Sequence, residues 1–226
     1  MAQNRSAAVM QQRVEAADSL DFFPTPPWAT RALVEHVLVP TRWPKFVLSA
    51  ARCWEPACGQ GDMLRPLRET FGEVFGSDIK EYAGEQAARC DFLIPWDCPP
   101  ASASFQWVIT NPPFRLAAQF IERGLDVAAD GVAMLVRQAF LEGEERYLSL
   151  WSVHPPAIVA PFAERVPMFR GRLDPEGSTA TAYCWLVWDK RLRRPRPEVC
   201  WIPPCRSQLE RRGDYRGPPP EPGTLL

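Results

Sequence analysis

The sequence predicts a doubly wound α/β domain with a mostly parallel sheet. Compact apolar runs at residues 74–78, 105–109 and 132–136 have the length and composition of buried parallel strands. Segments with the apolar spacing of helices, roughly 10–15 residues long, lie between such runs, and this alternation is typical of βαβ units. Because ligands of open parallel sheets bind at the carboxyl ends of strands, we expect the functional residues directly after these runs.

The composition suits one soluble domain. The chain has 226 residues, 46% hydrophobic and 23% charged, which is enough for one α/β domain and too few for two. Its net charge of −1 gives no overall attraction to nucleic acid, so a polyanion would have to meet a local basic patch. The seven cysteines are odd in number and form no Cys-x-x-Cys pair with histidines. This argues against a metal site and favours reduced thiols.

The sequence also predicts no membrane partner. Residues 1–20 contain no apolar stretch of the kind found in signal peptides, and we expect them to form a flexible arm. The longest uncharged run, at residues 147–163, is interrupted by His154 and three prolines and is shorter than the ~20 apolar residues of a spanning helix. These observations predict a cytoplasmic protein.

The first predicted helix follows a proline-rich turn. In the stretch Phe23-Pro24-Thr25-Pro26-Pro27, Thr25 is placed to cap a helix whose first turn tolerates the two prolines after it. Apolar residues between Trp28 and Val37 share one face at helical spacing, so we expect this helix to pack inward.

A glycine turn between a strand and a helix comes next. A short apolar strand ends at Glu55, residues 56–62 contain Gly59 and Gly61, and residues 63–68 have a helical pattern. Such a turn lets a ligand approach bare backbone at the start of a helix. The arrangement favours a nucleotide-like cofactor, with an ordinary turn as the alternative.

Two acidic residues are candidates for contacts with such a cofactor. Asp78 ends the run at residues 74–78, about twenty residues after the glycine turn, where an acid can accept both hydroxyls of a ribose. Asp91 could accept an adenine amine while the ring of Phe92 covers the base. A helix cap explains Asp78 alone about equally well, and a cap or a turn is the alternative for Asp91.

The stretch Asn111-Pro112-Pro113-Phe114 follows the strand predicted at residues 105–109, and its prolines stop that strand. Asn111 Oδ1 and the Pro112 carbonyl can each accept one N–H of a planar amine, while Phe114 stacks on the ring that carries it. The alternative is a plain turn at the end of a strand.

The rest of the chain predicts a helix near residues 116–125 and strands at residues 157–160 and 181–188. The loop at residues 164–172 contains three arginines and Phe169. Basic residues interleaved with an aromatic ring favour contact with nucleic acid, so Arg165 and Phe169 are candidate substrate-binding residues; a solvated charged loop is the alternative. Residues 191–226 predict a basic, proline-rich tail with little core of its own.

Together these stretches resemble class I S-adenosylmethionine-dependent methyltransferases, in particular small phage and prophage-type N6-adenine DNA methyltransferases. The sequence Glu-Pro-Ala-Cys-Gly-Gln-Gly at residues 55–61 is similar to the family's cofactor loop. The stretch at residues 23–27 resembles the element that contacts the methionine part of the cofactor. Asn111-Pro112-Pro113-Phe114 resembles the catalytic tetrapeptide, with Phe114 in place of the more usual tyrosine.

The resemblance implies a catalytic domain at residues 21–190, a Rossmann-like seven-stranded sheet whose last strand, at residues 181–188, is antiparallel, and S-adenosylmethionine as cofactor. The residues implied to bind this cofactor are Phe23, Pro24, Thr25, Glu55, Pro56, Ala57, Cys58, Gly59, Gly61, Asp78, Ile79, Asp91 and Phe92. The residues implied to act in catalysis are Asn111, Pro112, Pro113 and Phe114.

The resemblance further implies methyl transfer to the N6 amine of adenine in DNA, with the base flipped out of a duplex. An N6-adenine RNA methyltransferase would share the tetrapeptide. Protein glutamine methyltransferases use a similar Asn-Pro-Pro motif but carry a helical domain before the cofactor loop, and only about fifty residues precede Glu55. A catalytically silent cofactor- or nucleic-acid-binding subunit is the remaining alternative, against which the intact tetrapeptide argues.

Overall fold

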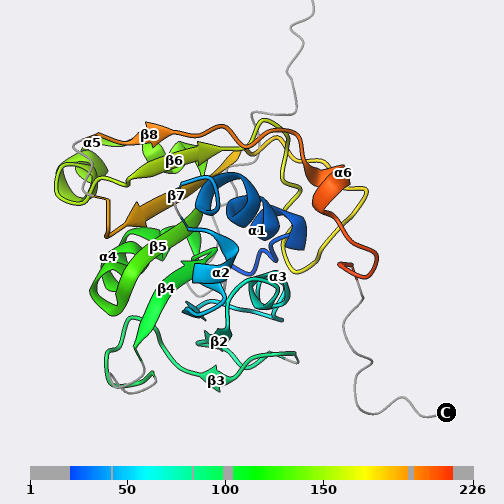
Figure 1. Cartoon of the computed structure of the whole chain (residues 1–226), viewed down its shortest axis with the longest axis horizontal. Helices are drawn as coiled ribbons and strands as arrows, with labels where there is room; N and C mark the ends of the chain where they lie inside the picture. Colours follow the sequence, from blue (N-terminus) through cyan, green and yellow to red (C-terminus); the bar gives the residue numbers. More distant parts are fainter. Residues whose placement is uncertain (1–20, 42, 83, 99–103, 193–195, 216–226) are drawn as a thin grey trace, which may run out of the picture.

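The protein is organised around a mixed sheet with strand order β3-β2-β1-β4-β5-β7-β6-β8 (Figure 1). The computed structural model describes residues 21–41, 43–82, 84–98, 104–192 and 196–215. The strands are β1 (Arg52–Glu55), β2 (Glu73–Asp78), β3 (Ala88–Arg89), β4 (Phe105–Thr110), β5 (Ala128–Arg137), β6 (Ile158–Pro161), β7 (Tyr183–Asp189) and β8 (Glu198–Val199).

The helices are short, apart from α4. They are α1 (Pro27–Leu33), η2 (Val34–Leu38), α2 (Lys45–Leu48), α3 (Leu64–Arg68), η3 (Phe114–Leu116), α4 (Ala117–Val127), η4 (Gln138–Leu141), α5 (Glu144–Arg146), η5 (Tyr147–Trp151) and α6 (Arg206–Leu209). The described part of the chain contains no helix with the length and apolar composition needed to cross a membrane.

The predicted doubly wound, mostly parallel sheet is confirmed. β3, β2, β1, β4 and β5 are parallel neighbours, and β7 is antiparallel to both β5 and β6. The antiparallel strand expected at residues 181–188 is therefore β7. The two-residue strand β8 pairs with β6 and adds an eighth strand to the seven that were expected.

Apolar clusters lie on both faces of the sheet because the side chains of its strands alternate between them. In β5, Ala133 and Leu135 belong to the cluster formed with α1, η2 and α2. Val132 and Met134 belong to the opposite cluster, which contains Phe120 of α4. Burial on both faces explains why these strands read as continuous apolar runs in the sequence.

The segment at residues 196–215 differs from the expected tail with little core. Ile202 and Cys205 are fully buried in the cluster beneath α1. Arg31, in α1, forms a 2.8 Å ion pair with Asp214, and both side chains are buried. Isolated apolar residues between prolines carry no periodic pattern, so this packing could not be predicted. Residues 1–20, 193–195 and 216–226 of the predicted arm and tail lie outside the described residues.

Candidate functional site

A pocket opens where the strand order reverses, between the carboxyl ends of β1 and β4. Ligands of open α/β sheets bind at such a switch point. The empty space of the pocket, including the part open to solvent, measures about 840 Å³. Five separate stretches of the chain contribute to its wall. The predicted site residues in this wall are Phe23, Pro24, Thr25, Glu55, Pro56, Ala57, Cys58, Asp78, Ile79, Asp91, Phe92, Asn111 and Pro113.

The ionisable side chains that line this pocket are mainly acidic. Its lining includes five acidic residues and, among the described residues, no lysine, arginine or histidine. The acidic residues are Asp21, Glu55, Asp62, Asp78 and Asp91. An acidic lining disfavours a ligand with phosphate groups and favours a cationic or neutral one. The pocket therefore suits a nucleoside-like cation better than a dinucleotide.

The glycine loop lies beside this pocket and is held by Asp78. Gly59 and Gly61 have φ angles of 51° and 93°, which side chains other than glycine rarely adopt. A Cβ at Gly59 would also lie 2.5 Å from the ring of Phe22. The Gly59 N–H donates to Asp78 Oδ2 at 2.9 Å, and the Lys80 N–H donates to Asp78 Oδ1 at 3.0 Å. Burial raises the pKa of the Asp78 carboxyl, and these N–H donors oppose the rise.

Glu55 joins the two strands at the switch point. Its side chain is buried, and its Oε1 accepts a 2.5 Å hydrogen bond from the Thr110 hydroxyl at the end of β4. Burial raises the pKa of the Glu55 carboxyl to about 8, although the Thr110 hydrogen bond lowers it. At neutral pH the carboxyl is therefore mostly protonated, and a cation placed beside it would favour its ionised form.

Asn111 follows β4 directly and has a fixed orientation. Its Nδ2 donates to the Phe23 carbonyl and to Thr25 Oγ1, both at 3.0 Å, and lies 3.7 Å from Met168 Sδ. With both amide hydrogens engaged, Oδ1 is turned the other way. This oxygen is buried and has no hydrogen-bond partner in the described part of the chain. Asn111 therefore presents a fixed, unused acceptor at the pocket.

The predicted helix cap at Thr25 is wrong. The residue before α1 is Pro26, and no side chain caps that end of the helix. Pro26 and Pro27 have no N–H to be capped, and the hydroxyl of Thr25 instead accepts a hydrogen bond from Asn111. The proline-rich stretch thus positions the amide that follows β4.

The remaining tetrapeptide residues lie at different depths. Pro113 lines the pocket, Pro112 is buried, and Phe114 is half-buried in η3. The ring centroid of Phe114 lies 5.1 Å from that of Phe23. The guanidinium of Arg137, at the end of β5, lies over the Phe114 ring with Cζ 3.7 Å from its centroid.

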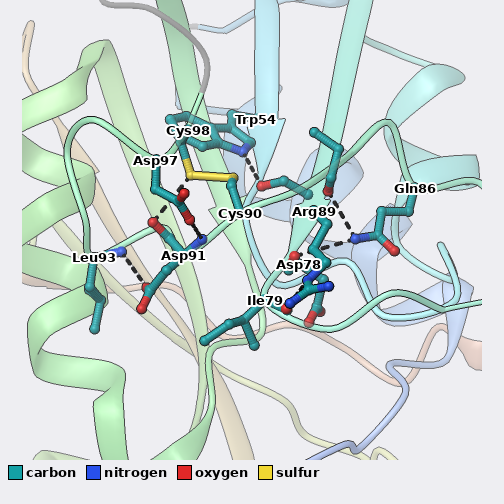
Figure 2. Close-up of a disulfide and its surroundings, with 12 residues drawn as sticks. Trp54, Asp78, Ile79, Gln86, Arg89, Cys90, Asp91, Leu93, Asp97 and Cys98 are labelled. Atoms are coloured by element: carbon teal, nitrogen blue, oxygen red, sulfur yellow. Dashed lines mark hydrogen bonds between the residues drawn. A yellow bond between two sulfur atoms is a disulfide. The ribbon is translucent and has the colours of Figure 1, made fainter.

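The loop that carries Asp91 is closed by a disulfide between Cys90 and Cys98 (Figure 2). Asp91 accepts a hydrogen bond from the Leu93 N–H, and its own N–H donates to Asp97. The expectation of reduced thiols is wrong for this pair, because the loop folds back and brings the two Cα atoms within 5.2 Å. Spacing alone did not reveal this turn.

Phe92 is more deeply buried than we expected for a loop residue whose ring covers the cofactor's adenine. It belongs to the core and packs edge-on against Trp54, with ring centroids 4.9 Å apart. It reaches the pocket as part of the wall.

The two predicted substrate-binding residues lie away from the pocket lining. Arg165 is exposed, and Phe169 packs beside Gly177 and Arg172. Their loop reaches the site through Met168, which contacts Asn111. Sequence reasoning missed Met168 and Arg137 as neighbours of the tetrapeptide. Arg137 could have been found, because it directly follows the apolar run at residues 132–136.

The sequence matches no protein-family model and no curated protein. Among solved structures, a putative RNA methyltransferase from Pyrococcus horikoshii is similar with a TM-score of 0.52 and 13% identity, covering 75% of this chain and 87% of that one. The chain has the class I methyltransferase fold. At this identity, the likeness to solved methyltransferases concerns the fold alone.

Two further structures are similar at lower TM-scores. One is the modification subunit of a putative type I restriction enzyme from Vibrio vulnificus, with a TM-score of 0.49 and 16% identity over 82% of this chain and 48% of that one. The present chain thus spans about half the length of that subunit. The other is a dimethyladenosine transferase from Plasmodium falciparum, with a TM-score of 0.45 and 12% identity over 74% of this chain and 63% of that one.

Proposed function

We propose that the protein transfers a methyl group from S-adenosylmethionine to the exocyclic N6 amine of adenine in DNA. The observation that carries this proposal is the state of Asn111. Its Oδ1 is buried without a partner, while its Nδ2 is held by Phe23 and Thr25. A buried acceptor without a donor is unfavourable. A substrate N–H at this position would remove that cost.

The pocket fits the proposed cofactor by charge and by shape. S-adenosylmethionine carries a nucleoside without phosphates and a sulfonium cation, which match the acidic lining. The residues just before the glycines, Pro56 to Cys58, line the pocket, and the positive φ angles of Gly59 and Gly61 shape the turn that places them there. In this proposal Asp78 accepts the ribose hydroxyls with the lone pairs that Gly59 and Lys80 leave free. Asp91 accepts the adenine amine of the cofactor. When bound, the cofactor supplies the methyl group and its leaving group.

The chain's own contribution to the reaction is orientation of the target amine. The lone pair of an aromatic amine is delocalised into its ring, so the nitrogen is a poor nucleophile. Asn111 Oδ1 and the Pro112 carbonyl would each accept one amine hydrogen. This favours a pyramidal nitrogen whose lone pair points at the methyl group. Phe114 would hold the ring by stacking.

Methylation of adenine in RNA is the second candidate. The similar Pyrococcus horikoshii protein is described as a putative RNA methyltransferase. The acceptors at Asn111 and Pro112 address the amine of adenine, which DNA and RNA share. The tetrapeptide therefore supports adenine as the target base in either polymer.

The test offers radiolabelled S-adenosylmethionine with duplex DNA, ribosomal RNA and transfer RNA in separate reactions, followed by analysis of the nucleosides. We expect labelled N6-methyladenine from DNA. Label on RNA adenine would replace the first candidate by the second. No turnover on any of the three polymers, with wild-type protein that binds the cofactor, would contradict both. Asn111→Ala is the matched control, because it retains the cofactor-binding residues.

A further inference from the structure

Arg137 covers one face of the Phe114 ring. Its guanidinium lies over the ring, with Cζ 3.7 Å from the Phe114 centroid and 5.7 Å from that of Phe23. Phe23 packs against the same Phe114 ring, and Tyr183 lies 6.5 Å away. A base that stacks on the ring face covered by the guanidinium must take its place.

Arg137 is held weakly for a partly buried cation. Its guanidinium lies near the Tyr183 hydroxyl and opposes the rise that burial causes in the pKa of that group. Its Nε is buried and has no hydrogen-bond partner in the described ranges. Among the ion pairs of the described residues, none involves Arg137. An unsatisfied guanidinium N–H is unfavourable, and an anionic oxygen is its strongest partner.

A hollow with about 450 Å³ of empty space, including the part open to solvent, lies beside this pair, separate from the acidic pocket. Phe114, Arg137, Phe140 and Arg146 line it, and no acidic residue does. The Arg146 guanidinium lies over the Phe140 ring with Cζ 4.3 Å from the centroid. The hollow therefore combines two aromatic rings with two cations. Nucleotides present the matching groups, which are flat bases and phosphate oxygens.

We propose that Arg137 binds the target nucleotide. Its guanidinium moves off the Phe114 ring, where the target base then stacks, and binds the backbone phosphate next to that nucleotide. This inference rests on the proposed function, because it assumes that a nucleic acid base reaches Phe114. The exchange replaces one stacked planar group by another and gives the buried guanidinium the oxygen that it lacks. Arginine suits this role because its planar fork both stacks on rings and binds phosphate at two points.

The experiment compares two substrates and four proteins. One oligonucleotide duplex carries a single adenine that the wild-type protein methylates; the other is identical except for neutral methylphosphonate linkages on both sides of that adenine. The proteins are wild type, Arg137→Gln, Arg137→Lys and Arg52→Gln. Arg52 is a matched control because it is a partly exposed arginine, paired with Glu73, at the start of β1, whereas Arg137 lies at the end of the parallel strand β5.

We expect Arg137→Gln to lower kcat/KM on normal DNA by roughly tenfold, mainly through KM, with the cofactor Kd unchanged. The wild-type protein should lose about as much on neutral DNA, and Arg137→Gln should lose nothing further there, because both changes remove the same contact. Arg137→Lys should retain part of the discrimination between the two substrates, since it keeps the charge. Arg52→Gln should behave like wild type.

Two outcomes would overturn the role of Arg137. If Arg137→Gln lowers kcat/KM relative to wild type by the same factor on both substrates, Arg137 only packs on Phe114. If Arg137→Gln methylates DNA faster than wild type, Arg137 only obstructs the ring. The same comparison by equilibrium binding of the two duplexes needs no methyl transfer. If the wild-type protein methylates no adenine, the proposed function fails. If the substitution and the neutral linkages weaken DNA binding additively while the wild-type protein methylates adenine, only the inference about Arg137 fails.

Discussion

The Thr110 hydroxyl donates a 2.5 Å hydrogen bond to Oε1 of Glu55 and so ties the carboxyl end of β4 to that of β1. Asn111 is the next residue after Thr110, and the glycine loop starts directly after Glu55. One buried hydrogen bond thus fixes the distance between the proposed cofactor loop and the proposed target-amine acceptor. Its energetics depend on pH, because Glu55 has a raised pKa.

The first prediction concerns this pH dependence. The folded-state pKa of Glu55, about 8, lies above its ordinary value of 4.5. Between these values the folded protein holds a proton that the unfolded chain has released. The free energy of unfolding therefore falls as pH rises through this window, by an amount on the order of a few kcal/mol. Glu55→Gln cannot ionise and should remove this decline.

Urea unfolding at pH 5, 6.5 and 8.5 measures the effect. Glu73→Gln is the control, because Glu73 is exposed and its hydrogen bond with Arg52 lowers its pKa. This variant should keep the decline of the wild-type protein. Parallel stability curves for wild type and Glu55→Gln would show that Glu55 is ionised throughout this range.

The second prediction concerns Asp78. Asp78→Ala removes the acceptor of the Gly59 and Lys80 N–H groups and the proposed acceptor of the ribose hydroxyls. Charge-assisted hydrogen bonds contribute ~1.5–3 kcal/mol, so the cofactor Kd should rise roughly 10–150-fold. Asp130→Ala is the control, since its exposed ion pair with Arg191 lies away from the pocket. An unchanged Kd by calorimetry, with the fold intact, would remove Asp78 from the site.

The strands and the pocket were largely readable from the sequence because both follow from local chemistry. Buried strands need continuous apolar runs, and their carboxyl ends must meet at one edge of a parallel sheet. This logic predicts that Glu55, Asp78 and Asn111 lie at one edge of the sheet, and all three line the same pocket.

Contacts between distant segments could not be predicted in this way. The hydrogen bond from Asn111 to Thr25 and the contact of Met168 with Asn111 depend on how loops return to the sheet. Ile202 is buried although it is a single apolar residue, without apolar neighbours at the spacing of a helix or a strand. In each case the contacting residue is far away in the sequence, so neither the hydrophobic periodicity nor the spacing of motifs predicts the contact.

The third prediction tests the disulfide. Cys98→Ser releases the covalent tie at the base of the loop that carries Asp91 and leaves the Asp91–Asp97 hydrogen bond to hold it. A looser loop must be ordered when the cofactor binds, so the cofactor Kd should rise by roughly tenfold or less.

A thiol reductant should weaken binding by the wild-type protein to the level of this variant and leave the variant unchanged. Cys200→Ser, at a free cysteine outside the pocket lining, is the control. A wild-type Kd that is insensitive to reduction, with loss of the disulfide verified by mass spectrometry, would show that the loop is ordered without it.

The last prediction separates the acceptor at Asn111 from its anchors and from the stacking ring. Asn111→Ala deletes the unpaired Oδ1, so kcat should fall by roughly 10²–10³ while the cofactor Kd stays nearly constant. Thr25→Val keeps that oxygen and removes one of the two hydrogen bonds that orient the amide, so its loss in kcat should be smaller. Phe114→Ala should lose ~1–3 kcal/mol of base stacking, seen mainly in KM for the nucleic acid, and Phe114→Tyr should retain activity. Single-turnover and steady-state rates distinguish these effects. If Asn111→Ala methylates adenine at the wild-type rate, the unpaired oxygen has no catalytic role, and the tetrapeptide is only a turn that ends β4.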